Sequence, residues 1–469
     1  MIDIKMTSAR AVLGFVLPFA VVLTMVLSGI DIFIALIAAL AVLVIYGMIL
    51  GAKLKDMEKA MANGASAVIG AVLVVILVGG LIGVWMACGS VPAMLYYGIK
   101  LINPQMFLPL AFIICAITSL ATGACWGTAA TVGVALIGVA AGIGVPLPLA
   151  AGAIISGSHF GDKLSPLSDT TLLASATARA DLYDHIVSML YDTIPVTVIC
   201  LVAYSILGAG YGSGASNLSE ITAITDGIQA EFRINLWMLV PPLVTIFMAV
   251  KRVPSIIVFG FNIFFGILWA MLFQGVGFAE MCKVAFYGYV SSSPVESVSS
   301  LLSRGGAASM ATTIYVSLFS GMFAGLLQNL NILPTLMGLA TRHIKSSKGL
   351  ITMTSATCIL LMVGGGGQYT TLTLPGTAFH DTYEKYDIKP CVLSRIMENS
   401  GTLIGSIIPW DVSGIFLAST LGVPTLVYLP FALLPLLSPF VGIINGWLGF
   451  GVFHSNEPVR LTLKRRKDN

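Results

Sequence analysis

Apolar segments long enough to cross a membrane recur along the whole chain, and they constrain the fold more than any other feature. A crossing helix needs about 20 apolar residues, and soluble domains carry about 25% charged residues. Here 57% of the residues are hydrophobic and only 10% are charged. Such segments lie at 11–28, 31–50, 67–86, 186–208, 235–250, 254–273, 307–328 and 426–448. The sequence therefore predicts an all-α polytopic membrane protein embedded in a lipid bilayer, without a sizeable soluble domain.

The charge and the cysteines narrow the range of functions. The net charge is only +3, and no basic face with interleaved aromatic residues is present, so a nucleic acid partner is not expected. The 7 cysteines are scattered and form no Cys-x-x-Cys or Cys/His cluster. Lys5 and Arg10 precede the first apolar segment as in a signal peptide, but no cleavage site follows, so a retained helix is expected. We expect no cofactor and no enzymatic nucleophile–base pair.

Sliding the sequence against itself reveals an internal repeat at a shift of 242 residues. Special backbone residues match at this shift: Gly64 with Gly306, Gly79 with Gly321, Gly123 with Gly365, and Pro148 with Pro390. Polar residues match as well: Thr128 with Thr370, Ser158 with Ser400, and Asp169 with Asp411. Nearer the start of each half, the two halves align at a smaller shift than 242 residues. The second half is therefore expected to contain an insertion near 275–293. The two halves are therefore expected to share one fold.

Loop charges predict that the two repeats have opposite orientations in the membrane. Lys and Arg accumulate in short cytoplasmic loops, so inverted repeats carry them in loops that do not match. Lys53, Lys55 and Lys59 follow the second apolar segment, whereas the matching region 291–306 has one basic residue. We expect inverted repeats at 1–208 and 235–450, an extracytoplasmic linker at 209–234, a basic tail at 451–469, and cytoplasmic termini.

Interrupted helices are expected in both repeats. Paired re-entrant hairpins are predicted at 106–121 with 123–144 and at 349–363 with 367–379. Inverted repeats with interrupted helices are how secondary transporters build a site near the middle of the bilayer. Irregular backbone at that depth has to line protein or a water-filled cavity. The sequence therefore predicts a transporter with its site where the repeats meet.

The strongest local signal is the polar segment 157–171, GSHFGDKLSPLSDTT, between two apolar stretches. It offers hard oxygen ligands that suit Na⁺: Asp162, Asp169, Ser158, Ser165, Ser168, Thr170 and Thr171. A carboxylate at low dielectric can lose a proton to take a cation and regain it afterwards. Lys163 is expected to lower the proton affinity of Asp162 or to be displaced by the cation. The alternative is an extramembrane loop with a solvated Asp162–Lys163 pair.

The matching segment of the second half is also polar and broken by proline. Its candidate ligands are Glu398, Asn399, Ser400, Asp411 and Ser413, with Pro409 before the last two. Arg395 precedes Glu398 by three residues, so the two could pair on one helix face, or Arg395 could gate the site.

Glycine-rich hairpin tips and two isolated groups complete the candidates. Thr122 and Thr128 flank the first tip, and Gln368 and Thr370 follow the second. Asp192 is either a proton-relay residue or a helix-end group, and His159 either titrates near neutral pH or only satisfies hydrogen bonds.

These motifs resemble those of a known family. G-D-K-x-S-P-L-S-D-T-T at 161–171, S-R-x-x-E-x-S-G-T at 394–402 and I-P-W at 408–410 are similar to NhaC-type sodium/proton antiporters, and the likeness spans nearly the whole chain. The resemblance implies the inverted repeats and paired hairpins of the ion-transporter superfamily, whose members are commonly homodimers. The NhaC-type family includes a branch that exchanges malate and protons for sodium and lactate. An Asn often follows the Pro-Trp pair in the family, whereas Asp411 stands here.

We therefore expect a bacterial inner-membrane antiporter that exchanges cytoplasmic Na⁺ for H⁺, with Na⁺ bound by Asp162, Asp169 and Asp411. The alternative is a sodium-coupled antiporter of organic anions such as malate and lactate, in which Lys163, Arg395 and helix N-termini hold the carboxylates. A channel is less favoured, because it has no need of paired interrupted helices.

Overall fold

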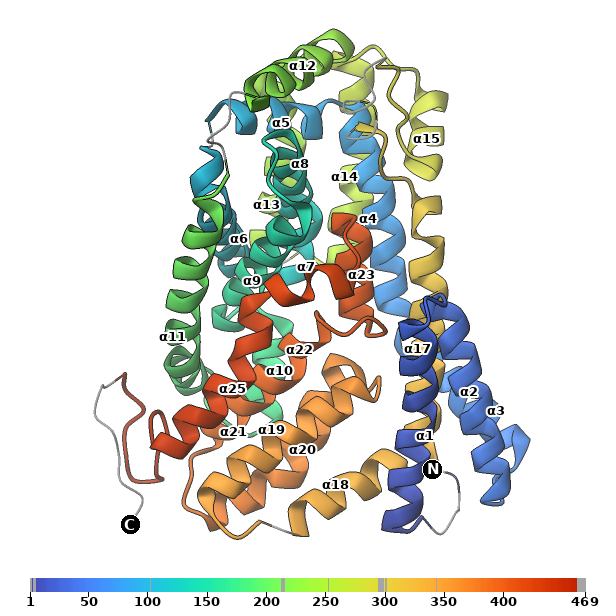
Figure 1. The fold of residues 1–469 in the computed structure, drawn as a ribbon, viewed down its shortest axis with the longest axis vertical. Helices are drawn as coiled ribbons and strands as arrows, with labels where there is room; N and C mark the ends of the chain where they lie inside the picture. The colour runs from blue at the N-terminus through green and yellow to red at the C-terminus, as the bar shows by residue number, and fades with distance from the viewer. Residues whose placement is uncertain are drawn as a thin grey trace.

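The computed structural model describes residues 2, 6–101, 103–211, 216–251, 253–293, 299, 302–342 and 344–461. All regular secondary structure in these residues is helical (Figure 1). Eight helices among the described residues are long and apolar enough to cross a membrane, or up to ten when two bent pairs are counted as single spans. The prediction of an all-α polytopic membrane protein is confirmed.

The first half is a series of helices with two interruptions that matter for the site, at 123–124 and at 165–168. Its elements are α1 Ser8–Leu27, α2 Ile32–Ile49, α3 Leu54–Ala67, α4 Ile69–Ala87, α5 Ser90–Leu101, η1 Pro104–Met106, α6 Phe107–Thr122, α7 Cys125–Thr128, η2 Ala129–Gly133, α8 Val134–Gly142, α9 Leu147–Leu164, α10 Asp169–Thr177 and α11 Leu182–Gly208.

The second half contains a similar series after a helix that joins the two halves. Its elements are α12 Ser216–Glu231, η3 Leu236–Leu239, α13 Val240–Val250, α14 Ser255–Phe273, α15 Phe278–Tyr287, η4 Ala307–Met310, α17 Ala311–Asn329, α18 Ile332–Arg342, α19 Ser347–Val363, α20 Gly367–Lys385, α21 Pro390–Met397, η5 Glu398–Thr402, α22 Leu403–Gly405, α23 Val412–Leu421, α24 Thr425–Tyr428, η6 Leu429–Phe431 and α25 Leu433–Leu448.

Helix boundaries recur at the shift found in the sequence. Adding 242 to the bounds of α4 gives the bounds of α17, and adding 242 to the first residue of α5 gives that of α18. The pair α6 and α7–α8 lies in the upper half of Figure 1, whereas α19 and α20 lie in the lower half. The hairpin tips share one backbone feature, because Gly123 and Gly365 both have a left-handed φ. The inversion of the repeats in the membrane stays a prediction.

Several sequence predictions differ from the structure in detail. The span expected at 426–448 is wrong: α25 is separated by Ala432 from the short elements α24 and η6, and α23 meets them at 86°. The expected linker contains α12, and the expected insertion near 275–293 contains α15. Lys5, Arg252, residues 294–298 and the end of the basic tail, 462–469, lie outside the described residues.

Glycines allow α3 and α17 to pack at very short range. A Cβ atom on Gly64 would overlap the carbonyl oxygen of Gly321 and approach the Cα atom of Gly325. Gly321 and Gly325 are four residues apart on α17, so they form the small-x-x-x-small face that lets membrane helices approach closely. This crossing joins the first half to the second.

We expect Gly64→Ala to destabilise the protein by about 1–3 kcal/mol, because the added methyl group forces two backbones apart. Gly70→Ala is the matched control, since a Cβ atom there has open space. The melting temperatures of the two purified variants in detergent would be compared with that of the wild type. Equal melting temperatures for both variants would contradict this packing argument.

Candidate functional site

The polar segment 157–171 forms a break between two helices. α9 ends at Leu164, and Ser165 is extended because the residue before a proline disfavours helical backbone. Ser165 Oγ donates to the Leu120 carbonyl at 2.9 Å, which fixes the break against α6. α10 begins after Ser168, whose Oγ accepts from the Thr171 amide at 3.5 Å. The break therefore has defined geometry rather than being an open loop.

The matching break in the second half begins with a π-helical segment, η5. A π turn carries one extra residue and often lies at a functional site. All five residues of η5 are buried, and it contacts α10, α19 and α20. η5 therefore places Glu398, its first residue, against the break between α9 and α10.

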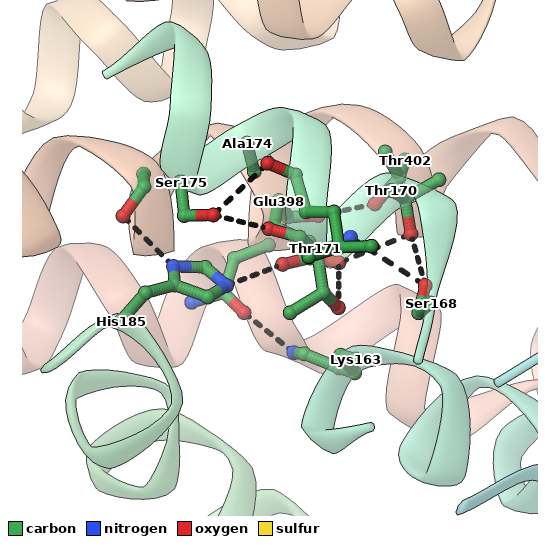
Figure 2. Close-up of polar contacts among 12 residues, drawn as sticks. Lys163, Ser168, Thr170, Thr171, Ala174, Ser175, His185, Glu398 and Thr402 are labelled. Carbon is green, nitrogen blue, oxygen red and sulfur yellow. Dashed lines mark hydrogen bonds and ion pairs between the residues drawn. The ribbon is translucent and has the colours of Figure 1, made fainter. Parts of the chain in front are cut away.

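Glu398 is held by donors from two other helices (Figure 2). Its side chain is 1% exposed. Its Oε2 lies 2.9 Å from His185 Nε2 on α11, and the hydroxyls of Thr170 and Thr171 donate to its Oε1 at 3.3 Å each. Ser394 Oγ lies 2.8 Å from the other ring nitrogen of His185. Glu398 is thus a buried carboxylate with hydrogen-bond partners on both oxygens.

A chain of buried charged and amide groups runs from Lys163 to Arg395. Lys163 Nζ donates to Asn399 Oδ1 at 2.6 Å, and Asn399 Nδ2 donates to Asp192 Oδ2 at 2.6 Å. Asn445 Nδ2 donates to Asp192 Oδ1 at 2.8 Å. Arg395 Nε pairs with Asp192 Oδ2 at 3.0 Å, and both side chains are fully buried. Asn399 therefore couples a lysine at the break to an ion pair between α11 and α21.

A narrow cavity, too small in this conformation to hold a water molecule, lies between Glu398 and the break. It is lined by Cys125, His159, Asp162, Lys163, Gln368, Glu398, Thr402 and Leu403, and we call it the narrow cavity. These residues come from both hairpin tips, from α9 and from the segment that starts with η5. His159 is 2% exposed, and neither of its ring nitrogens has a hydrogen-bond partner. Two carboxylates, one ammonium group and one unpartnered imidazole therefore face the same small space.

A second, wider cavity lies on the other side of the first hairpin tip. Its volume is about 270 Å³, and its lining includes Thr122, Thr128, Asp169 and residues of α13 and α14. We call it the wide cavity. Asp169 is exposed and faces this space, whereas Asp162 faces the narrow cavity.

The structure places the three predicted aspartates in three different environments. Asp162 lines the narrow cavity and Asp169 the wide one. Asp411 caps α23 by accepting from the Ser413 amide at 2.9 Å, and Gln368 Nε2 donates to Ser413 Oγ at 2.9 Å. The three aspartates therefore do not share one cavity in this conformation, and which of them binds Na⁺ stays a prediction.

The remaining predicted hydroxyls lie in different surroundings, and that of Ser158 has no hydrogen-bond partner. Ser400 Oγ lies 2.6 Å from Ser355 Oγ, Thr370 is partly buried on α20, and Ser158 is buried on α9. Asp162 and Lys163 do not form a solvated pair, because Lys163 is 1% exposed and donates to Asn399. The alternative of a solvated Asp162–Lys163 pair is therefore wrong, and the depth of this segment in the membrane stays a prediction.

The structure also corrects two sequence predictions, one for Arg395 and one for Asp192. Arg395 does not pair with Glu398 on one helix face, because its partner is Asp192 and that of Glu398 is His185. Asp192 is not a helix-end group: it is the eleventh residue of α11, about three turns from its start, and it is fully buried. The sequence reasoning missed His185 and Asn445 as site residues. The spacing of His185, Ser188 and Asp192 puts them on one helical face, and this polar face was a signal available in the sequence.

The sequence matches the model of the Na⁺/H⁺ antiporter family over residues 2–188 and 159–450. It is 36% identical over 443 residues to the malate-2H(+)/Na(+)-lactate antiporter of Bacillus subtilis (strain 168), covering 94% of both chains. It is 35% identical over 450 residues to the Na(+)/H(+) antiporter NhaC of Alkalihalophilus pseudofirmus, covering 94% of this chain and 97% of that one. It is 34% identical over 387 residues to the arginine/ornithine antiporter ArcD of Halobacterium salinarum, covering 82% and 80%. The family match includes every residue that lines the narrow cavity.

Proposed function

Because this chain belongs to the Na⁺/H⁺ antiporter family and is a multi-pass membrane transporter rather than an enzyme, we propose that it exchanges cytoplasmic Na⁺ for external protons across a bacterial inner membrane. The observation that carries the proposal is the meeting of Asp162 and Glu398 at one narrow cavity. A buried carboxylate is costly unless it is protonated or paired with a cation. Competition between Na⁺ and H⁺ for these two groups therefore couples the two fluxes.

The neighbouring residues support ion exchange at this cavity. The hydroxyls of Thr170 and Thr171 are oxygen donors beside Glu398, and Thr402 and Gln368 supply further oxygen atoms in the cavity lining. Lys163 adds a positive charge that a bound cation has to displace or tolerate. In this structure the ammonium group donates to the amide oxygen of Asn399, which places its charge beside the carboxylates of the cavity.

The relative from Bacillus subtilis motivates a second candidate, sodium-coupled exchange of malate and lactate. A dicarboxylate needs free cationic groups, and Arg395 already pairs with Asp192 and donates to the Gly451 carbonyl at 2.9 Å. This leaves Lys163 as the cationic group of the narrow cavity among the described residues. The charge balance of the cavity therefore favours inorganic cations. Inverted repeats, cytoplasmic termini and a homodimer are further parts of the proposal.

Purified protein in proteoliposomes tests the two candidates. An imposed Na⁺ gradient is expected to move protons in the opposite direction with no organic acid present, as reported by a pH-sensitive dye inside the vesicles. Protein-free liposomes with the same gradient give the background leak. Proton movement that requires lactate and malate on opposite sides would reject simple Na⁺/H⁺ exchange and favour the second candidate.

A further inference from the structure

The wide cavity has the size and the charge of a cation-binding vestibule. Its volume of about 270 Å³ is many times the ~15 Å³ that a cavity needs to hold one water molecule. Among the described residues of its lining, Asp169 is the one charged group. Its field is therefore negative, which concentrates cations and repels carboxylate anions.

The wall of this space also contains a buried hydroxyl without a partner. Thr128 is 1% exposed, and its Oγ1 has no hydrogen-bond partner in the structure. The neighbouring threonines of the lining are satisfied by backbone carbonyls of their own helices: Thr131 Oγ1 donates to Gly127 at 2.7 Å, and Thr245 Oγ1 donates to Pro241 at 3.0 Å. An unpaired buried hydroxyl costs free energy unless an ion or water fills the gap. Thr128 is thus an available oxygen ligand.

One thin wall separates the wide cavity from the narrow one. Gly123, Ala124, Gly127 and Thr128 line the wide cavity, whereas Cys125 lines the narrow one. The wall is therefore the hairpin tip with the single turn α7. It packs closely against the break in the first half, because a Cβ atom on Gly123 would overlap Leu167. On its far side Trp126 stacks on Phe416 of α23, with ring centroids 4.7 Å apart.

We propose that the wide cavity is an entry vestibule that binds a monovalent cation through Asp169 and Thr128 before the cation passes α7 and reaches Asp162 and Glu398. This assignment rests on the proposed function, because the exchanged ion is Na⁺. It gives the two aspartates of the motif different roles. Asp162 exchanges the ion for a proton, and Asp169 raises the local cation concentration.

The test is the Na⁺ dependence of exchange by Asp169→Asn in proteoliposomes. We expect the half-saturating Na⁺ concentration to rise about tenfold, as the negative field of the vestibule is lost, while the maximal rate stays near that of the wild type. Thr128→Val is expected to shift the Na⁺ dependence in the same direction by a smaller factor. Asp56→Asn, which removes an exposed carboxylate from α3, is the control for total charge and should change neither quantity.

Guanidinium provides a second measurement, because it is a monovalent cation too large for the narrow cavity. It is expected to compete with Na⁺ in the wild type and to lose potency in Asp169→Asn. A vestibule is excluded if Asp169→Asn lowers the maximal rate at saturating Na⁺, since Asp169 would then belong to the exchange site. It is equally excluded if the Na⁺ dependence and the guanidinium inhibition are unchanged. Failure of the proposed function is a separate result, namely no Na⁺-driven proton movement by the wild type.

Discussion

Asp162→Asn is expected to abolish Na⁺-driven proton movement, with a loss of at least about 100-fold in the maximal rate. The amide keeps the shape of the side chain but can neither release a proton to the cavity nor neutralise a bound Na⁺. Asp162 lines the narrow cavity together with Glu398 and Lys163, so no other position offers the same combination of charges among the described residues. The defect is expected at every Na⁺ concentration, because it concerns the exchange step rather than ion capture.

The measurement is the maximal rate of proton movement in proteoliposomes that contain equal amounts of folded protein. Size-exclusion chromatography in detergent checks folding, and the exposed Asp56→Asn on α3 checks for effects of total charge. Near-normal exchange by Asp162→Asn would remove this residue from the exchange site. A defect that saturating Na⁺ rescues would instead place Asp162 in ion capture, which is the behaviour expected of Asp169.

The sequence predicted the elements well because helix formation and membrane insertion are recorded locally. The apolar segments and the shift of 242 located most helices, and α4 and α17 obey that shift at both ends. The span at 426–448 was misjudged because hydropathy measures how apolar a segment is and not how its backbone turns. Ala432, with φ −79° and ψ 66°, breaks it between Pro430 and Pro435, and hydropathy does not take account of these prolines.

The site was predicted in part, and its partners were not. The two polar segments do meet, and Asp162, Lys163 and Glu398 share the narrow cavity. Which charged side chains pair depends on which helix faces meet in the folded protein. Closeness in the sequence therefore did not predict the partner of a charged residue. Glu398 was expected beside Arg395, yet its partner is His185, 213 residues away. The three aspartates looked equivalent as ligands, but only tertiary packing distinguishes a cavity wall from a helix cap.

Arg395→Met is expected to lower the free energy of unfolding by about 3–5 kcal/mol, because it leaves the charge of Asp192 buried without its counter-ion. It also removes the donor to the Gly451 carbonyl that holds the chain after α25. Melting temperature in detergent is the measurement. Lys389→Met is the matched control: Lys389 is 4.0 Å from Asp184, and both side chains are partly exposed, so its loss should cost about 0–1 kcal/mol. Equal losses of melting temperature in the two variants would contradict the claim that breaking a buried ion pair costs more stability than breaking an exposed one.

The double variant Arg395→Met/Asp192→Asn separates the stability of this ion pair from its role in transport. Removing both charges is expected to recover much of the lost stability, because no uncompensated charge remains buried. The function should not recover with it. Asn399 donates to Asp192 and accepts from Lys163, so without the Asp192 carboxylate the amide no longer has a charged acceptor that orients it towards the lysine. A stable double variant with an altered Na⁺ dependence would show that the pair positions Lys163, whereas unchanged transport would make it purely structural.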